Sequence, residues 1–128
     1  MSRPKVLIVD DDSGICEFVE WGLGDRGIEV MTACNGREAL EVLASERPHA
    51  IILDMRMPVM DGYEFARAYR EMPGPRAPIV IMTAYLDPKA VAAQVGAEGY
   101  VSKPFDLVTL FDILRKHLPE PDEQMPVR

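Results

Sequence analysis

Cysteines and long apolar runs are both scarce in this chain of 128 residues. Its two cysteines, Cys16 and Cys34, are far apart and form no CxxC pair, which argues against a disulfide framework and against a zinc site. No apolar run reaches the length of a membrane span, and the stretch before the first acidic run is too short for a signal peptide. We therefore expect a cytoplasmic protein that has no membrane partner.

Basic residues are also outnumbered. The chain has 14 Lys and Arg against 21 Asp and Glu, for a formal net charge of -7. An acidic chain without a basic cluster is a poor candidate for binding nucleic acid directly. Hydrophobic residues make up 48% of the sequence, which is enough for one globular domain and excludes a disordered or collagen-like chain.

Short apolar runs recur at intervals that fit a strand followed by a returning helix. Three of them, at 6–9, 50–53 and 79–82, are nearly continuous, which is typical of strands buried on both faces. Two weaker runs lie at 28–33 and 100–101. The sequence therefore predicts an α/β fold with five strands in a doubly wound parallel sheet and helices on both faces.

Cap residues and apolar stripes predict the helices over 13–25, 37–46, 63–71, 88–95 and 106–117. Phe18 falls on the apolar stripe of the first helix, so we expect it to face the core. Asp61 with Glu64 has the spacing of a capping box, and Asp87 precedes a proline that suits a first helical position. The prediction is one domain over 1–118, followed by a flexible tail or linker stub over 119–128.

Chemically active side chains follow four of the predicted strands. The acidic run 10–12 follows the first strand, and Asp54, Thr83 and Lys103 follow the third, fourth and fifth. Each of these residues alone fits a turn, a helix cap or solvated surface. In a sheet of this kind, however, ligands bind at the carboxyl ends of the strands, so the joint placement favours a single site.

The chemistry open to such a cluster is restricted. Carboxylates that lie together must take up protons or share a cation, and Mg²⁺ suits oxygen ligands and accepts phosphate as a further ligand. A lysine and a hydroxyl nearby would bind anionic oxygens, and one carboxylate could attack a phosphoryl group. These residues therefore favour metal-assisted phosphoryl transfer to an aspartate, without indicating which one.

Over residues 5–118 the sequence resembles the receiver domains of bacterial two-component response regulators, similar to the single-domain chemotaxis and sporulation types. The matching stretches are VLIVDDD (6–12), LDMRMPVMDG (53–62), IMTA (81–84) and GYVSKPF (99–105). The resemblance implies a flavodoxin-like sheet with the strand order 2-1-3-4-5. It also implies a signalling switch, not an enzyme, that catalyses only its own phosphorylation and dephosphorylation.

The resemblance assigns roles to residues of the site. Asp54 matches the phosphoacceptor, which takes a phosphoryl group from a phosphohistidine. Asp11 matches the carboxylate that binds Mg²⁺ directly, Asp10 matches a partner that acts through water, and Arg56 would offer its backbone carbonyl. Lys103 would pair with the phosphoryl oxygens and be followed by a cis peptide bond.

Other positions match the switch and its timing. Thr83 matches the hydroxyl that moves to the phosphoryl group, and Tyr100 the aromatic ring that turns inward with it. Asp12 matches no ligand, and we expect it to begin a helix. Arg56 and Tyr85 occupy the positions that tune dephosphorylation, and their size suggests a long-lived phosphorylated form; the alternative is that both are loop side chains without a kinetic role.

The resemblance also has a departure and an implied set of partners. The interval from Thr83 to Lys103 is slightly shorter than in most receivers, so we expect a shortened fourth helix of about two turns. The implied partners are a histidine kinase or histidine phosphotransfer protein, and downstream either a separate protein or a covalently linked output domain. We expect a monomer or a weak dimer that depends on phosphorylation.

Two other functions stay open at this point. The acidic run after the first strand also fits a haloacid-dehalogenase-like Mg²⁺-dependent phosphatase, with Asp10 as the nucleophile. In that case Asp54 would have no role. A receiver-like module that binds partners without phosphorylation is the second alternative, although the full set of site residues argues against it.

Overall fold

A computed structural model describes residues 3–84 and 87–119 of the chain, along which five strands alternate with five helices. The strands are β1 (Lys5–Val9), β2 (Glu29–Ala33), β3 (Ala50–Asp54), β4 (Ile79–Thr83) and β5 (Gly99–Ser102). The helices are α1 (Ser13–Gly24), α2 (Gly36–Leu43), α3 (Gly62–Arg70), α4 (Pro88–Val95) and α5 (Leu107–Leu114). This alternation confirms the predicted α/β class.

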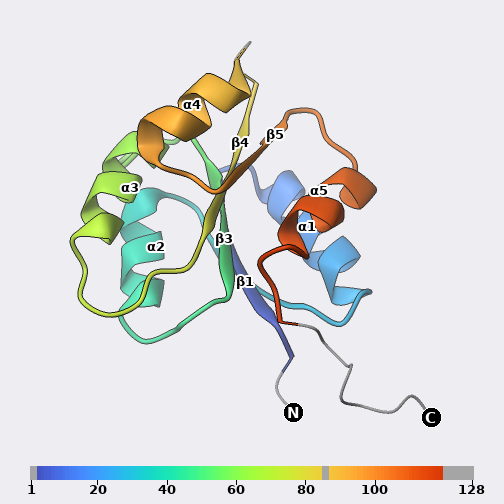
Figure 1. The fold of residues 1–128 in the computed structure, drawn as a ribbon. Coiled ribbons are helices and arrows are strands. Elements are labelled where there is room, and N and C mark those ends of the chain that lie inside the picture. The colour runs from blue at the N-terminus through green and yellow to red at the C-terminus, as the bar shows by residue number, and fades with distance from the viewer. Residues whose placement is uncertain (1–2, 85–86, 120–128) are drawn as a thin grey trace.

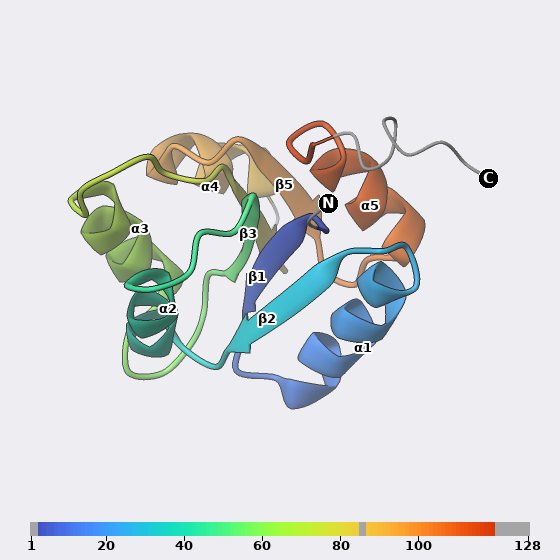
Figure 2. The ribbon, with the colours of Figure 1, turned by 90° about the horizontal axis from the view of Figure 1, so that it is seen from below.

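The strands form one parallel sheet in the order β2-β1-β3-β4-β5, as the resemblance implies. Helices α1 and α5 cover one face of the sheet, and α2, α3 and α4 cover the other (Figures 1 and 2). The strand order reverses between β1 and β3, because β2 lies on one side of β1 and the later strands lie on the other. In folds of this class the ligand crevice lies at that reversal, over the carboxyl ends of the strands.

The three central strands form the middle of the core. Every residue of β3 and β4 is buried, and so is β1 from Val6 onward, which confirms the prediction made from their continuous apolar runs. On the face that α2, α3 and α4 cover, the rings of Phe65 and Tyr69 stack with 5.6 Å between their centroids. On the other face, Val19, Leu23 and Leu110 pack against the sheet.

The helix starts confirm the caps predicted at Asp12, Asp61 and Asp87. A side-chain oxygen accepts a backbone N–H at the first turn of each helix, and these cap residues are Asp12, Asn35, Asp61, Asp87 and Asp106. Helix α4 has eight residues, little more than the two turns expected, and ends at a glycine with a left-handed backbone. None of the helices within 3–84 and 87–119 has the length and apolar character needed to cross a bilayer.

Three details of the sequence prediction are wrong. Helices α2 and α5 end at Leu43 and Leu114, three residues early, and the chain continues in hydrogen-bonded turns rather than in a helix. Phe18 does not face the core, since 43% of it is exposed. Its ring lies 6.4 Å from that of Phe105 at the rim of the sheet, while its neighbour Val19 takes the buried position.

Candidate functional site

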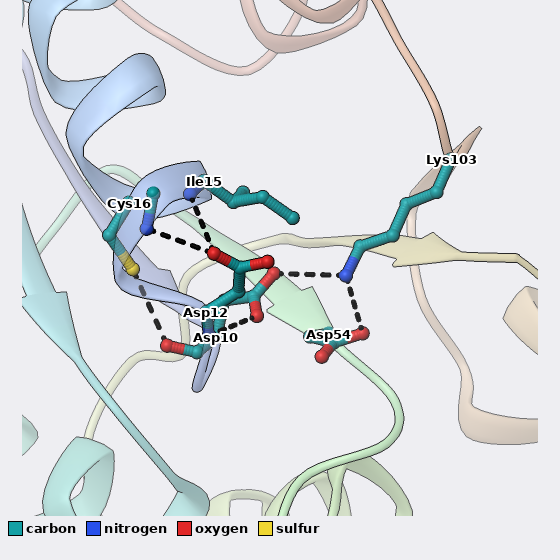
Figure 3. A network of polar contacts seen from close by, with 7 residues as sticks. Asp10, Asp12, Ile15, Cys16, Asp54 and Lys103 are labelled. Carbon is teal, nitrogen blue, oxygen red and sulfur yellow. Dashed lines mark hydrogen bonds and ion pairs between the residues drawn. The ribbon is translucent and has the colours of Figure 1, made fainter.

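The predicted site residues meet at the carboxyl edge of the sheet. Asp54 is the last residue of β3, Asp10 follows β1, and Lys103 follows β5. Figure 3 shows the ammonium of Lys103 reaching between the two carboxylates, 3.1 Å from Oδ2 of Asp10 and 3.3 Å from Oδ1 of Asp54. Parallel pairing aligns the strand ends, so residues far apart in the sequence come within ion-pair distance.

The buried carboxylate of Asp10 is held on both of its oxygens. Oδ1 accepts the backbone N–H of Asp12 at 2.9 Å, and Oδ2 accepts from Lys103. The residue is 1% exposed, and its own N–H donates to the carbonyl of Ala33 on β2 at 3.0 Å. These contacts fix Asp10 at the floor of the site, where its charge acts on Asp54.

Asp54 combines low exposure with an ionisable group. It is 6% exposed, and burial together with the negative charge of Asp10 raises its pKa from 3.8 to about 6. The ammonium of Lys103 and the backbone N–H of Arg56 act in the opposite direction by stabilising the carboxylate. At neutral pH the carboxylate is therefore charged in most molecules and available as a nucleophile.

Lys103 responds to the same environment with the opposite sign. Burial by itself lowers the pKa of a lysine, but the hydrogen bond to Asp10 and the charge of Asp54 more than offset it and raise the pKa of Lys103. The ammonium therefore stays charged between the two carboxylates. The peptide bond between Lys103 and Pro104 is cis, as the resemblance implies.

Three carboxylates could hold a metal ion. One oxygen each of Asp10, Asp11 and Asp54 lies within 4.8 Å of the others. Asp11 is exposed and the other two are buried, so the cluster opens to solvent on one side. An all-oxygen set of this charge fits a hard divalent cation such as Mg²⁺ and leaves room for water or phosphate as further ligands.

Asp12 has the separate structural role that the sequence predicts. Its side chain accepts the backbone N–H groups of Gly14 and Ile15, at 2.9 and 3.2 Å, and so caps helix α1. Both bonds are accepted by Oδ1, which points to the start of the helix (Figure 3). The three acids of one run thus differ in function because β1 ends and α1 begins within it.

The remaining predicted residues lie around this centre. Thr83 ends β4 and is 2% exposed, and its carbonyl accepts the backbone N–H of Lys103 at 2.9 Å. Tyr100 on β5 is 41% exposed, so its side chain is directed outward. Arg56 is exposed in the loop that follows Asp54. Tyr85 lies outside the described residues.

Sequence reasoning missed an apolar groove beside the site. It has a volume of about 550 Å³, and Ile15, Phe18, Ala84 and Phe105 line it together with Lys103. The sequence feature that could have indicated the groove is a pair of phenylalanines, one on α1 and one after Lys103, but only the fold brings their rings together. The groove gives an incoming molecule an apolar surface next to Lys103.

Comparisons with known proteins agree with this arrangement. A family model described as the response regulator receiver domain matches residues 6–115. The transcriptional regulatory protein PrrA of Mycobacterium leprae is 41% identical over 112 residues, which are 86% of this chain and 48% of that protein. The chain thus spans about half the length of this relative.

Two single-domain proteins are similar over nearly their full length. Sporulation initiation phosphotransferase F of Bacillus subtilis is 36% identical over 121 residues, which are 93% of this chain and 97% of that protein. The structure of the chemotaxis response regulator CheY4 of Vibrio cholerae matches with a TM-score of 0.83 and 40% identity. It covers 91% of this chain and 100% of the CheY4 chain.

Proposed function

The chain belongs to the response regulator receiver family, and from this premise we propose that it takes a phosphoryl group from a histidine kinase onto Asp54. As a receiver domain it is a signalling switch and not a catalytic enzyme. The observation that carries the proposal is the geometry around Asp54. Its carboxylate ends a buried strand, 3.3 Å from the ammonium of Lys103 and within the cluster that Asp10 and Asp11 complete.

The acceptor chemistry follows from these groups. An oxygen of the ionised Asp54 carboxylate attacks phosphorus, and the P–N bond of the phosphohistidine breaks. The electron pair of that bond leaves with the imidazole nitrogen, and the ring departs neutral because its other nitrogen carries a proton. Lys103 turns from Asp54 to the oxygens of the phosphoryl group, while Asp10 keeps it charged and in place.

We propose Mg²⁺ as the cofactor, with Asp10, Asp11 and Asp54 and the backbone carbonyl of Arg56 as the groups that hold it. When bound, the ion neutralises charge on the phosphoryl oxygens. The fit rests on the donor set, which consists of hard oxygen ligands with an open side at Asp11. The residues also have the charge to retain a divalent ion, since the cluster has three carboxylates and the lysine paired with two of them carries one positive charge.

The switch is proposed to act through Thr83 and Tyr100. The carbonyl of Thr83 is bonded to the backbone of Lys103, so β4 and β5 are coupled where the phosphoryl group would sit. Movement of the Thr83 hydroxyl toward that group frees space into which the outward ring of Tyr100 turns.

Arg56 and Tyr85 are proposed to shield the phosphoryl group from water, and Arg56→Asn and Tyr85→Ala should then shorten its half-life. An unchanged half-life in both variants would mean that they have no kinetic role.

We propose that the histidine kinase docks on α1 and on the loop after β5, at the groove described above. The groove joins an apolar wall at Phe18 and Phe105 to the ammonium of Lys103, which suits a helix that presents a phosphorylated histidine.

The output is proposed to be a separate protein or a linked domain. The linked domain fits the match to about half of the longer PrrA. Residues 1–118 would be the receiver and 119–128 a tail or linker.

The test is intact-mass spectrometry after incubation with a small phosphodonor, with and without Mg²⁺. We expect one phosphoryl adduct that requires Mg²⁺ and is absent from Asp54→Asn. A protein that forms no adduct would be a module that binds partners without phosphorylation. An adduct that survives Asp54→Asn would instead support the phosphatase alternative with Asp10 as the nucleophile, and Asp10→Asn would decide it.

A further inference from the structure

Gly36, the first residue of α2, touches the loop that follows the phosphoacceptor strand. Its backbone N–H donates to the carbonyl oxygen of Met60 at 3.1 Å. A Cβ atom on Gly36 would lie 2.7 Å from Cγ of Met60 and 3.0 Å from its carbonyl oxygen. Protein Cβ atoms hardly ever come so close to a neighbour, so any side chain at this position has to displace Met60.

The loop is tightly turned next to this contact. The N–H of Met60 donates to the carbonyl of Pro58 at 2.7 Å and closes a three-residue turn around Val59, whose φ is 70°. A γ-turn with positive φ is rare, and a β-branched residue adopts it only at an energetic cost. Both backbone polar groups of Met60 are therefore engaged, the N–H inside the loop and the carbonyl with α2. Surrounding contacts of this kind are what keeps a strained turn in place.

The same loop supplies a contact to Asp54. The backbone N–H of Arg56 donates to the Asp54 carboxylate, and Gly62 closes the base of the loop by donating to the carbonyl of Met55 at 3.2 Å. The loop is thus fixed at its base by Gly62 and near its end by Gly36. Helices α2 and α3 lie side by side on one face of the sheet, so the loop before α3 can reach the start of α2 (Figures 1 and 2).

We propose that Gly36 is a positioning residue for the phosphoacceptor site, because its close contact with Met60 holds the loop in the conformation in which the Arg56 backbone meets Asp54. This inference rests on the proposed function of Asp54. Gly36 acts through Met60 and the loop, and its lack of a side chain is what permits the contact. The start of α2 therefore contributes to the site although the helix supplies none of its proposed ligands.

A matched pair of substitutions tests the proposal. Gly36 and Gly24 both lie in helices and neither has a left-handed φ, so alanine suits the backbone at both positions. A Cβ on Gly24 meets nothing within 4 Å. Gly36→Ala should shift the amide resonance of Arg56 in the metal-free protein, raise the Kd for Mg²⁺ by about tenfold, as for other residues that orient metal ligands, and slow phosphorylation. Gly24→Ala should leave all three at their wild-type values.

A second substitution separates positioning from simple destabilisation. Met60→Ala removes the Cγ and Sδ atoms that a Cβ on Gly36 would strike and leaves only the tight contact with the carbonyl oxygen, so the Mg²⁺ affinity of the double variant should be closer to that of Met60→Ala than Gly36→Ala is to wild type. If Gly36→Ala lowers only the unfolding midpoint and leaves the Arg56 resonance and the Kd for Mg²⁺ unchanged, the contact is structural and the proposal is overturned. If the wild type takes up no phosphoryl group, the proposed function fails, whereas the Arg56 resonance still decides whether Gly36 positions the loop.

Discussion

The body of β3 and its carboxyl end are buried to almost the same degree, but burial has opposite effects on their residues. Leu53 has no exposed surface and packs in the core, while the next residue, Asp54, is 6% exposed and faces Asp10 and Lys103. The first strand repeats this arrangement, with Val9 at 0% and Asp10 at 1%. Burial stabilises the apolar residue of each pair, whereas it opposes ionisation of the acidic one.

This difference separates stability from function within one step along the chain. The bodies of the strands contribute the apolar area that holds the fold together. The strand ends hold carboxylates whose ionisation is opposed by burial and that the proposed chemistry needs. Truncating a core side chain in the strand bodies should therefore lower stability, whereas neutralising the buried Asp54 at the strand end should raise it. The following predictions run from the largest expected change to the smallest.

The largest change is expected in the body of β3. Leu53→Ala should lower the free energy of unfolding by about 3–5 kcal/mol, because a fully buried leucine leaves a cavity as well as losing apolar contacts. Urea denaturation followed by circular dichroism measures the change. A loss below about 1 kcal/mol would mean that the core collapses into the space and that the strand body is less tightly packed than its burial indicates.

Removing the cation at the strand ends should have the next largest effect. Lys103→Gln leaves Asp10 and Asp54 without their neutralising partner, so the free energy of unfolding in metal-free buffer at pH 7 should fall by about 2–3 kcal/mol. The double variant with Asp54→Asn should regain part of this loss, because one of the two facing charges is gone. Equal stability of the single and double variants would show that the carboxylates do not repel each other.

Asp54→Asn should stabilise the metal-free protein at pH 7. The pKa of Asp54 is raised to about 6 by burial and by Asp10, so the folded state holds the proton more firmly than the unfolded state. Stability is therefore highest below the unfolded pKa near 4 and falls as the pH rises to about 6. We expect a gain of about 1–2 kcal/mol, and the full pKa change, which already includes the ion pair with Lys103, sets an upper limit of ~3 kcal/mol.

Thermal denaturation of both proteins between pH 4 and pH 7 measures the effect. The wild type should lose stability across this range relative to Asp54→Asn, with the difference levelling off above about pH 7. Parallel curves would mean that Asp54 has an ordinary pKa in the folded protein. Adding Mg²⁺ should stabilise the wild type more than Asp54→Asn, which lacks one of the proposed ligands, since a ligand that binds the folded state stabilises it.

The smallest change in stability is expected at Asp11. This acid is exposed, so Asp11→Asn should alter the free energy of unfolding in metal-free buffer by less than about 0.5 kcal/mol. Its affinity for Mg²⁺, measured by calorimetry, should nevertheless fall by at least about tenfold. Unchanged affinity would remove Asp11 from the proposed metal ligands. The difference between the buried acids and the exposed one would then have no counterpart in metal binding.

Much of the fold could be predicted from local patterns. The central strands are buried on both faces, so their apolar runs are continuous and visible in the sequence. The N-cap at Asp61 and the left-handed end at Gly96 follow from side chains and backbone preferences that act within one turn. The predictions of where α2 and α5 end and of how Phe18 is buried were wrong. These features depend on how far each helix extends over the sheet and on what lies at the rim of the sheet.

The same distinction between local patterns and tertiary structure applies to the site. The sequence by itself determined which groups follow the strands, because strand ends are marked by the change from apolar residues to acid, hydroxyl or lysine. Only the tertiary structure decided that Asp10 is buried and paired while Asp11 is exposed, and that Lys103 reaches two carboxylates at once. Adjacent residues have the same local pattern, whereas burial and ion pairing depend on side chains that parallel pairing brings in from distant strands.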